Sequence, residues 1–306
     1  MADARPIGVF DSGVGGLTVL REILRRLPHE STIYLGDNAR APYGTRSDDE
    51  VLAFSRQSLD ELAARDVKAI VVACNTSTAV ALAELRRRYD LPILGVIRPG
   101  AAAAALATRT RRVGMIATPA TVRSHAYFLA IKDENPAVEV YEHATPALVP
   151  LVEAGSLSGP DVAGVVREAL APLLGERDAN GEFIFPLPTS AQVDTLLLGC
   201  THYPLLRPVI QEIAGERVAV VDSATASASA LVELISMNGL EAPGTTRGTA
   251  ADPGRAGHDA PDGRVSTAFH IQLTTGDAAP FRMLAGRLFG TAFPDVEAIE
   301  LGAAVR

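Results

Sequence analysis

The sequence predicts an α/β protein built from two pseudo-symmetric α/β domains with mostly parallel sheets and an active site in the cleft between them. Three observations support this. Short apolar runs without alternation are separated by helix-like segments, which is typical of parallel strands buried on both faces. The same order of segments occurs twice along the 306 residues. Each of the two cysteines follows the third apolar run of its series.

The first series extends to about residue 98. Its helix at 17–28 is amphipathic and stopped by Pro28, and its helix at 47–66 opens with a serine cap and an acidic first turn. In order, we expect strands at 6–11, 31–37, 68–74 and 92–97, and helices at 17–28, 47–66 and 78–90. Asp11, Asp37 and Cys74 fall at the carboxyl ends of strands, where parallel sheets bind ligands.

The second series follows Arg98-Pro99-Gly100. In order, it predicts a helix at 101–110, strands at 111–117 and 137–144, a helix or turn at 148–157, a strand at 194–200, a helix at 204–215, and a strand and helix within 217–235.

The two series match as an internal repeat. Residues 7–20 resemble 113–126, 31–44 resemble 137–150, and 68–77 resemble 193–203 in pattern. Two such halves facing each other would bring both cysteines to one cleft. The domains are therefore predicted at 1–98 plus 214–306, and at 99–213.

Two polar segments interrupt this pattern. Residues 173–192 lie before the third repeat unit of the second half, where the first half has no equivalent, and predict a surface insertion. Residues 241–265 predict a flexible segment. Residues 266–290 then regain a strand-then-helix pattern that should pack back onto the body.

Composition argues against several classes of protein, among them nucleic-acid-binding, membrane-spanning and disulfide-rich secreted proteins. The net charge of −8 and the pI of about 5.3 argue against a broad nucleic-acid or anionic-membrane surface. No apolar run approaches the roughly 20 residues that span a bilayer, and the start of the sequence lacks a signal-peptide pattern. Two cysteines make no disulfide framework, so we expect a cytoplasmic protein, and the scattered histidines predict no metal site.

The cysteines allow two interpretations. A cysteine at the end of an apolar strand is often a small core residue. Two cysteines at equivalent places, Cys74 and Cys200, instead predict a pair of thiols that act on opposite faces of a substrate. A thiol has an ordinary pKa of roughly 8.5, so it can take or give a proton near neutral pH. Inversion at a carbon next to a carboxylate needs one such group on each face.

The neighbours of the cysteines fit this chemistry. Asn75 and Thr76 follow Cys74 at a predicted helix N-terminus, which favours anions, and Thr201 and His202 follow Cys200. Asp11 and Ser12 end the first strand, although Asp or Ser there is commonly a helix cap. The turn "DSGVGGL" lacks the spacing of a phosphate loop, and we expect it to present backbone N–H groups to a carboxylate.

Four motifs carry a resemblance to a known family. "GVFDSGVGGLTVL", "YLGDNARAPYGTRS", "VVACNTSTA" and "LGCTHYPLL", in this order, resemble bacterial glutamate racemases of the cofactor-independent aspartate/glutamate racemase superfamily. The resemblance covers most of residues 5–235 and again about 266–292. It implies interconversion of L- and D-glutamate to supply D-glutamate for peptidoglycan, without a cofactor or metal. It also implies a homodimer; DNA gyrase, which some members inhibit, is a partner that the sequence does not support.

The resemblance also implies residue roles. Cys74, assisted by Asp11, would be the base for D-glutamate, and Cys200, assisted by His202, the base for L-glutamate. Glu153 matches an acidic catalytic residue near Cys200. The implied substrate-binding residues are Asp11, Ser12, Tyr43, Gly44, Asn75, Thr76, Thr118, Thr121, Thr201 and His202. Arg98 and Thr145 depart from the family pattern, and we interpret Arg98 as part of a solvated hinge.

Three alternatives stay open. A racemase for aspartate or another acidic substrate would share the motifs, although "PYG" and "CTH" favour glutamate. A binding or regulatory protein on the same scaffold would not need both thiols and their assisting residues. A thiol hydrolase or transferase would use Cys200 with His202 and would leave Cys74 unexplained.

Overall fold

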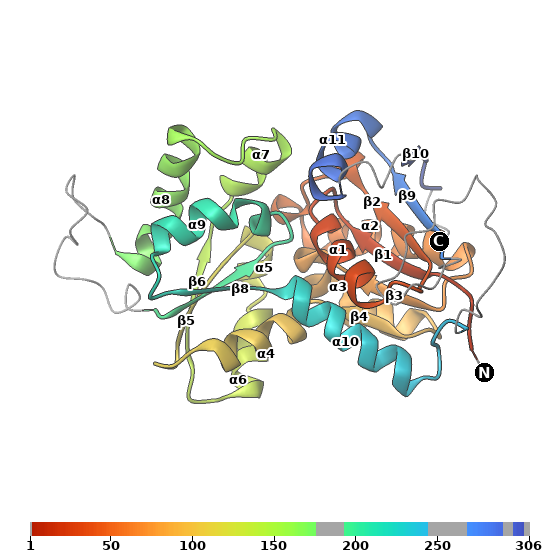
Figure 1. Ribbon diagram of the computed structural model, residues 1–306, viewed down its shortest axis with the longest axis horizontal. Helices are drawn as coiled ribbons and strands as arrows, with labels where there is room; N and C mark the ends of the chain where they lie inside the picture. The colour runs from red at the N-terminus through yellow and green to blue at the C-terminus, as the bar shows by residue number, and fades with distance from the viewer. Residues whose placement is uncertain (1, 176–192, 244–267, 290–295, 303–306) are drawn as a thin grey trace.

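The computed structural model describes residues 2–175, 193–243, 268–289 and 296–302. Two sheets form its two halves (Figure 1). The six-stranded sheet has the order β10-β9-β2-β1-β3-β4, and the four-stranded sheet has the order β6-β5-β7-β8. Every strand pair is parallel, which confirms the predicted fold class.

The strands are β1 (Ile7–Asp11), β2 (Thr32–Gly36), β3 (Ala69–Val72), β4 (Ile93–Gly95), β5 (Arg112–Ala117), β6 (Glu139–Ala144), β7 (Thr195–Gly199), β8 (Ala219–Asp222), β9 (His270–Thr274) and β10 (Val296–Ala298). β1, β2, β3 and β7 are buried along their whole length, as continuous apolar runs predict for central parallel strands.

The helices are α1 (Leu17–Arg26), α2 (Asp48–Ala64), α3 (Asn75–Arg88), α4 (Ile97–Ala107), α5 (Pro119–Arg123), α6 (Ala126–Glu134), α7 (Leu148–Glu153), α8 (Pro160–Leu174), α9 (Arg207–Ala214), α10 (Ser223–Met237) and α11 (Ala278–Phe289), with short 3-10 helices η1 (Asn38–Arg40), η2 (Tyr43–Thr45) and η4 (Tyr203–Leu206). The predicted serine cap of α2 is Ser47, which forms a reciprocal capping box with Glu50. No helix in the described ranges is long and apolar enough to cross a membrane.

The internal repeat appears in the topology. β2-β1-β3-β4 in one sheet corresponds to β6-β5-β7-β8 in the other, so the first strand of each series is central and the third carries the cysteine at its end. The helices that follow the fourth strands cross over. α4 packs against β7 and β8 of the second half, α10 packs against α1 and β4 of the first half, and the two helices contact each other (Figure 1). Each half therefore supplies one helix to the other.

Some predicted boundaries differ from the structure. β8 pairs with β7 in the four-stranded sheet, so the chain returns to the first half after residue 222 rather than near 214. The pattern of an apolar strand does not reveal which of two sheets it joins, because that depends on distant partners. β9 and α11 pack onto the first half as expected. The segments 176–192 and 244–265, which hold most of the predicted insertion and flexible tract, lie outside the described residues.

Candidate active site

Both cysteines border one cavity between the two halves. Cys74 directly precedes α3 as its N-cap, two residues after β3, and Cys200 directly follows β7. Both thiols are free and buried. The cavity has a volume of about 350 Å³, its open mouth included. Its lining consists of Ser12, Ala41, Pro42, Tyr43, Gly44, Cys74, Asn75, Thr76, Thr118, Val149, Glu153, Cys200, Thr201 and His202.

The Cys74 thiol is buried and lies beside polar groups. Its Sγ lies 3.5 Å from the Ser12 hydroxyl and accepts a hydrogen bond from the backbone N–H of Ser77 at 3.4 Å. Burial, together with the charge of Asp11, raises the pKa of Cys74, and the bonds from Ser12 and Ser77 offset only part of that rise. Cys74 is therefore favoured as a neutral thiol that is ready to donate a proton.

Cys200 lies beside an imidazole that a carboxylate orients. Nδ1 of His202 is 3.7 Å from the Cys200 Sγ, and Nε2 of His202 is 2.5 Å from Oε1 of Glu153. Burial by itself lowers the pKa of His202, but the bonds to Cys200 and Glu153 outweigh burial and raise the pKa well above its ordinary value. Near neutral pH the ring is thus a cation next to Cys200.

Asp11 lies beneath the cavity rather than in its lining. Its side chain is fully buried, accepts the Thr201 hydroxyl at 3.2 Å and accepts the Gly13 N–H at 3.1 Å. Burial raises the pKa of Asp11, and the positive charge of His202 and these hydrogen bonds oppose the rise. Asp11 is hydrogen-bonded to Thr201, the residue after Cys200, whereas it acts on Cys74 through its charge, which raises the pKa of that thiol.

Asn75 offers an unused donor. Its Oδ1 accepts the Tyr127 hydroxyl at 2.6 Å. Its Nδ2 is buried without a hydrogen-bond partner, and Asn75 borders the cavity. A buried amide donor left unpaired costs free energy, so a carboxylate oxygen in the cavity would satisfy it.

Three hydroxyls join the two halves at the cavity. The Oγ1 atoms of Thr76 and Thr118 are 2.9 Å apart, and Thr118 lies 3.0 Å from the hydroxyl of Thr121. Thr118 also caps α5, because its hydroxyl accepts the N–H of Thr121. Thr121 itself is buried behind the lining. This cluster can direct hydroxyl groups toward an anion held between α3 and α5.

Two glycines allow close approach of chain segments around the cavity. A Cβ at Gly15 would lie 2.5 Å from Nδ1 of His202, and a Cβ at Gly44 would lie 2.5 Å from Cβ of Thr118. A side chain at either place would displace a residue that borders the cavity. The "DSGVGGL" and "PYG" motifs therefore need glycine for packing against the opposite half.

The structure brings together most of the residues that the sequence singled out. All the predicted site residues except Asp11 and Thr121 border the cavity, and these two bond directly to residues that do. The sequence did not single out Ala41, Pro42 and Val149, which also form part of the lining. Apolar lining residues carry no chemical signal in a sequence, although 41 and 42 adjoin "PYG".

The two residues that depart from the family pattern have simple structural roles. Arg98 lies in α4 and forms an exposed ion pair with Asp133 at 2.9 Å. Thr145 is buried and donates to the Tyr203 hydroxyl at 2.9 Å. Among the described residues, no group of three or more His, Cys, Asp or Glu side chains is arranged to hold a metal ion.

Comparison with known proteins agrees with this geometry. The family description "Asp/Glu/Hydantoin racemase" matches residues 7–181. A glutamate racemase of Lactococcus lactis is 46% identical over 242 residues, which are 78% of this chain and 83% of that protein. The crystal structure of a glutamate racemase isoform from Bacillus anthracis has a TM-score of 0.82 at 36% identity, covering 97% of this chain and 98% of that one. A glutamate racemase from Francisella tularensis in complex with D-glutamate has a TM-score of 0.79 at 32% identity, covering 98% of each chain.

Proposed function

The chain belongs to the Asp/Glu/Hydantoin racemase family, and from this premise we propose that it is a glutamate racemase that inverts its substrate with two cysteines. The observation that carries the proposal is the placement of Cys74 and Cys200. They occupy equivalent positions of a structural repeat and border the same cavity, from opposite halves of the molecule.

The raised pKa of Cys74 suits the conversion of L- to D-glutamate, for which the proposed mechanism requires Cys200 to begin as a thiolate beside the His202 imidazolium. Cys200 takes the α-proton from one face of the substrate, while the Cys74 thiol donates its proton to the other face. The enzyme then holds a proton on Cys200 and a thiolate at Cys74, which is the form that accepts D-glutamate for the reverse reaction. The Cys74 thiol donates to the Ser12 hydroxyl, and when the thiolate forms, that hydroxyl can turn and donate to the sulfur, as the Ser77 N–H already does.

The other groups stabilise charge on the substrate. Negative charge moves onto the α-carboxylate as the α-proton leaves, so donors around that carboxylate lower the barrier. The unpaired Nδ2 of Asn75 and the hydroxyls of Thr76 and Thr118 are the candidate donors. His202 adds a positive charge on the Cys200 side, oriented by Glu153. The proposed steps use only groups of the chain, with no cofactor or metal.

The wider role follows from the resemblance to the family. We propose that the D-glutamate produced is used in the cytoplasm for peptidoglycan synthesis. We also propose that the chain acts as a homodimer. An interaction with DNA gyrase has no supporting residue in the described structure and is not part of the proposal.

The test is racemisation by the two single variants. The wild-type protein should bring the circular dichroism of L- and D-glutamate to zero in deuterated buffer, with deuterium gained at the α-carbon. Cys74→Ala and Cys200→Ala should each lose at least about 10³-fold in kcat, because one face then lacks its acid or base. Each variant should still exchange the α-proton of one enantiomer, D-glutamate for Cys200→Ala and L-glutamate for Cys74→Ala.

A second candidate function has one observation in its favour. Cys200, His202 and Glu153 form a nucleophile–base–orienting series like that of thiol hydrolases. In a hydrolase, Cys200→Ala would abolish activity on an ester or amide substrate, and Cys74→Ala would leave it intact. Activity on aspartate but not glutamate would keep the two-thiol mechanism and change the substrate.

A further inference from the structure

Asp37 is a buried carboxylate that the proposed chemistry does not use. It directly follows β2, its side chain is fully buried, and its N–H donates to the carbonyl oxygen of Asp11 at 3.0 Å. A buried carboxylate is stable only when charged or polar donors compensate for lost water. The arrangement of those donors shows what Asp37 holds in place.

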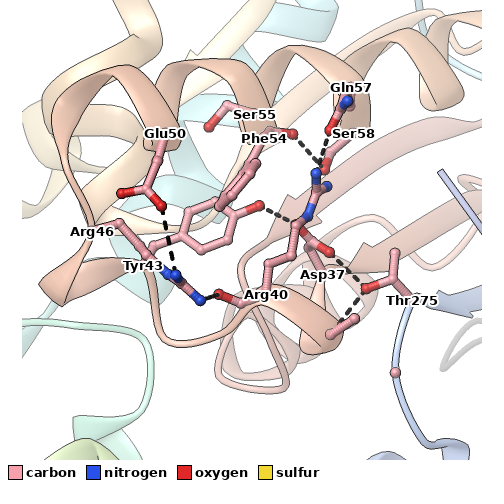
Figure 2. A network of polar contacts seen from close by, with 12 residues as sticks. Asp37, Arg40, Tyr43, Arg46, Glu50, Phe54, Ser55, Gln57, Ser58 and Thr275 are labelled. Atoms are coloured by element: carbon pink, nitrogen blue, oxygen red, sulfur yellow. Dashed lines mark hydrogen bonds and ion pairs between the residues drawn. The ribbon is translucent and has the colours of Figure 1, made fainter. Parts of the chain in front are cut away.

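Three donors from three chain segments converge on Asp37 (Figure 2). The Thr275 hydroxyl, just after β9, donates to Oδ1 at 2.6 Å. Nε of Arg40 donates to Oδ2 at 2.6 Å, and the Tyr43 hydroxyl donates to the same oxygen. Both carboxylate oxygens are therefore occupied, and the end of β2 is tied to η1, η2 and the C-terminal segment.

Tyr43 connects this network to the cavity. Residues 41–44 all border the cavity, while the Tyr43 hydroxyl is bonded to Asp37. Burial and the charge of Asp37 raise the pKa of Tyr43 far above its ordinary value, so the hydroxyl remains a donor throughout the working pH range. The ring is held between Phe10 and Phe54, at centroid distances of 6.3 Å and 5.6 Å.

Arg40, the second donor to Oδ2 of Asp37, is itself held by contacts with α2. The guanidinium of Arg40 lies 4.2 Å over the ring of Phe54, and Arg40 also donates to Gln57 of α2 (Figure 2). On the inner side, Gly44 packs directly on Thr118 of the opposite half. A shift at Asp37 would thus be transmitted through Tyr43 to a loop that contacts both halves at the cavity.

We infer that Asp37 is a positioning residue that fixes the cavity-lining loop 41–45 through the Tyr43 hydroxyl, and that this sets the affinity for the substrate. The inference rests on the proposed function, since that loop is taken to line the glutamate site. Asp37 does not touch the substrate. It acts on binding and leaves the proton transfers of the two thiols unaltered.

The experiment compares Asp37→Asn, Tyr43→Phe and the double variant. Tyr43→Phe keeps the ring and removes one hydroxyl, and the KM for glutamate should rise about tenfold with kcat within about threefold of wild type. Asp37→Asn should raise KM by at least as much. In the double variant, Asp37→Asn should add less than about twofold to the KM of Tyr43→Phe, because the path to the loop is already broken.

Glu30→Gln is the matched control. Glu30 is also a buried carboxylate of the first half, paired with Lys68 at 2.5 Å, but it lies at the opposite end of β2 from Asp37. This variant should lower the thermal stability and leave KM within about twofold, because losing a buried charge partner costs stability without touching the loop.

Hydrogen exchange of the free protein separates failure of this inference from failure of the proposed function. Amides in the peptide 38–46 should exchange faster in Asp37→Asn and Tyr43→Phe than in wild type or Glu30→Gln. If wild-type protein does not racemise glutamate, the proposed function fails, and this exchange still decides whether Asp37 orders the loop. The inference would be overturned if the 38–46 amides exchanged at the wild-type rate in both variants, or if active variants kept the wild-type KM. It would also be overturned if Asp37→Asn raised KM as much in the Tyr43→Phe background as in wild type.

Discussion

Replacing Glu153 by Gln tests the charge arrangement around Cys200. Glu153 is the partner of Nε2 of His202, at 2.5 Å, and Gln keeps the size and hydrogen-bonding ability of the side chain but removes its charge. The charge of Glu153 would then no longer oppose the burial of the ring, while the contact with Cys200 and the interaction with Asp11 would remain. The pKa of His202 should fall, and the imidazolium should be lost at a lower pH.

The size of the effect on stability follows from the exposure of the two partners. The His202 side chain is 6% exposed and that of Glu153 is 32% exposed. Breaking a fully buried pair costs about 3–5 kcal/mol and an exposed pair about 0–1, so we take about 2 kcal/mol for this half-buried pair. Loss of the ion pair should therefore lower the unfolding free energy of the protonated enzyme by about 2 kcal/mol, and the pKa of His202 should fall with it.

The sign of the effect on stability follows from the raised pKa of His202. The stability that the protonated ring contributes is fully present below its unfolded pKa of about 6.5, and it is lost as pH rises through the folded value. The difference in unfolding free energy between wild type and Glu153→Gln should therefore be largest near pH 6 and should shrink as pH rises. The alkaline limb of kcat/KM should move to lower pH in Glu153→Gln, because the imidazolium is lost earlier.

The assay is racemisation and urea unfolding at pH 6 to 9.5, with the His202 ring followed by NMR. Glu142→Gln is the control, since Glu142 also lies 2.5 Å from an imidazole, but that ring, of His125, is 65% exposed and outside the cavity. The pH profile of racemisation by Glu142→Gln should match that of the wild-type protein. A Glu153→Gln protein with an unshifted alkaline limb and a pH-independent stability difference would refute the reasoning.

Three further substitutions have defined outcomes. Gly15→Ala places a Cβ 2.5 Å from Nδ1 of His202 and should lower kcat/KM by at least about 100-fold, measured at a temperature where the variant is folded; near-normal activity would contradict it. Gly164→Ala, in α8 with open space around it, should raise the unfolding free energy by about 1 kcal/mol in a urea titration without changing activity. Asp194→Asn should cost about 1 kcal/mol at pH 7 after allowance for solvent screening, because hydrogen bonds from residues 108–110 outweigh the effect of burial and lower the pKa of Asp194. Its stability contribution is present above the unfolded pKa of about 3.9 and lost as pH falls through the lower folded value, so the difference should narrow from pH 5 to 3, and a constant difference would argue against it.

The sequence predicted the elements of the fold well where periodicity is strong. Continuous apolar runs predicted β1, β2, β3, β5 and β7, because central parallel strands need apolar side chains on both faces. It did not predict the short helices α5 and α6, or α8 with its internal proline. α5 packs mainly against α3 and η2, α6 against α4, and α8 against α9, and the local sequence does not show which helices will meet.

The candidate site divides in the same way. The residues with reactive or polar groups could be identified because they follow strands in a repeated pattern, as Cys74 and Cys200 do. Their partners could not all be identified. The bond between Asp11 and Thr201 spans 190 residues, and its existence depends on how the two halves face each other.

By itself, the sequence determined that two similar α/β units each place a cysteine at the end of a parallel strand, since strand and helix patterns are local and survive in the order of residues. Only the tertiary structure decided that β8 belongs to the second sheet, that Asp11 lies beneath the cavity, and that Asp37 holds Tyr43. Those contacts arise between segments that meet only after folding, where burial makes each polar group depend on a specific partner.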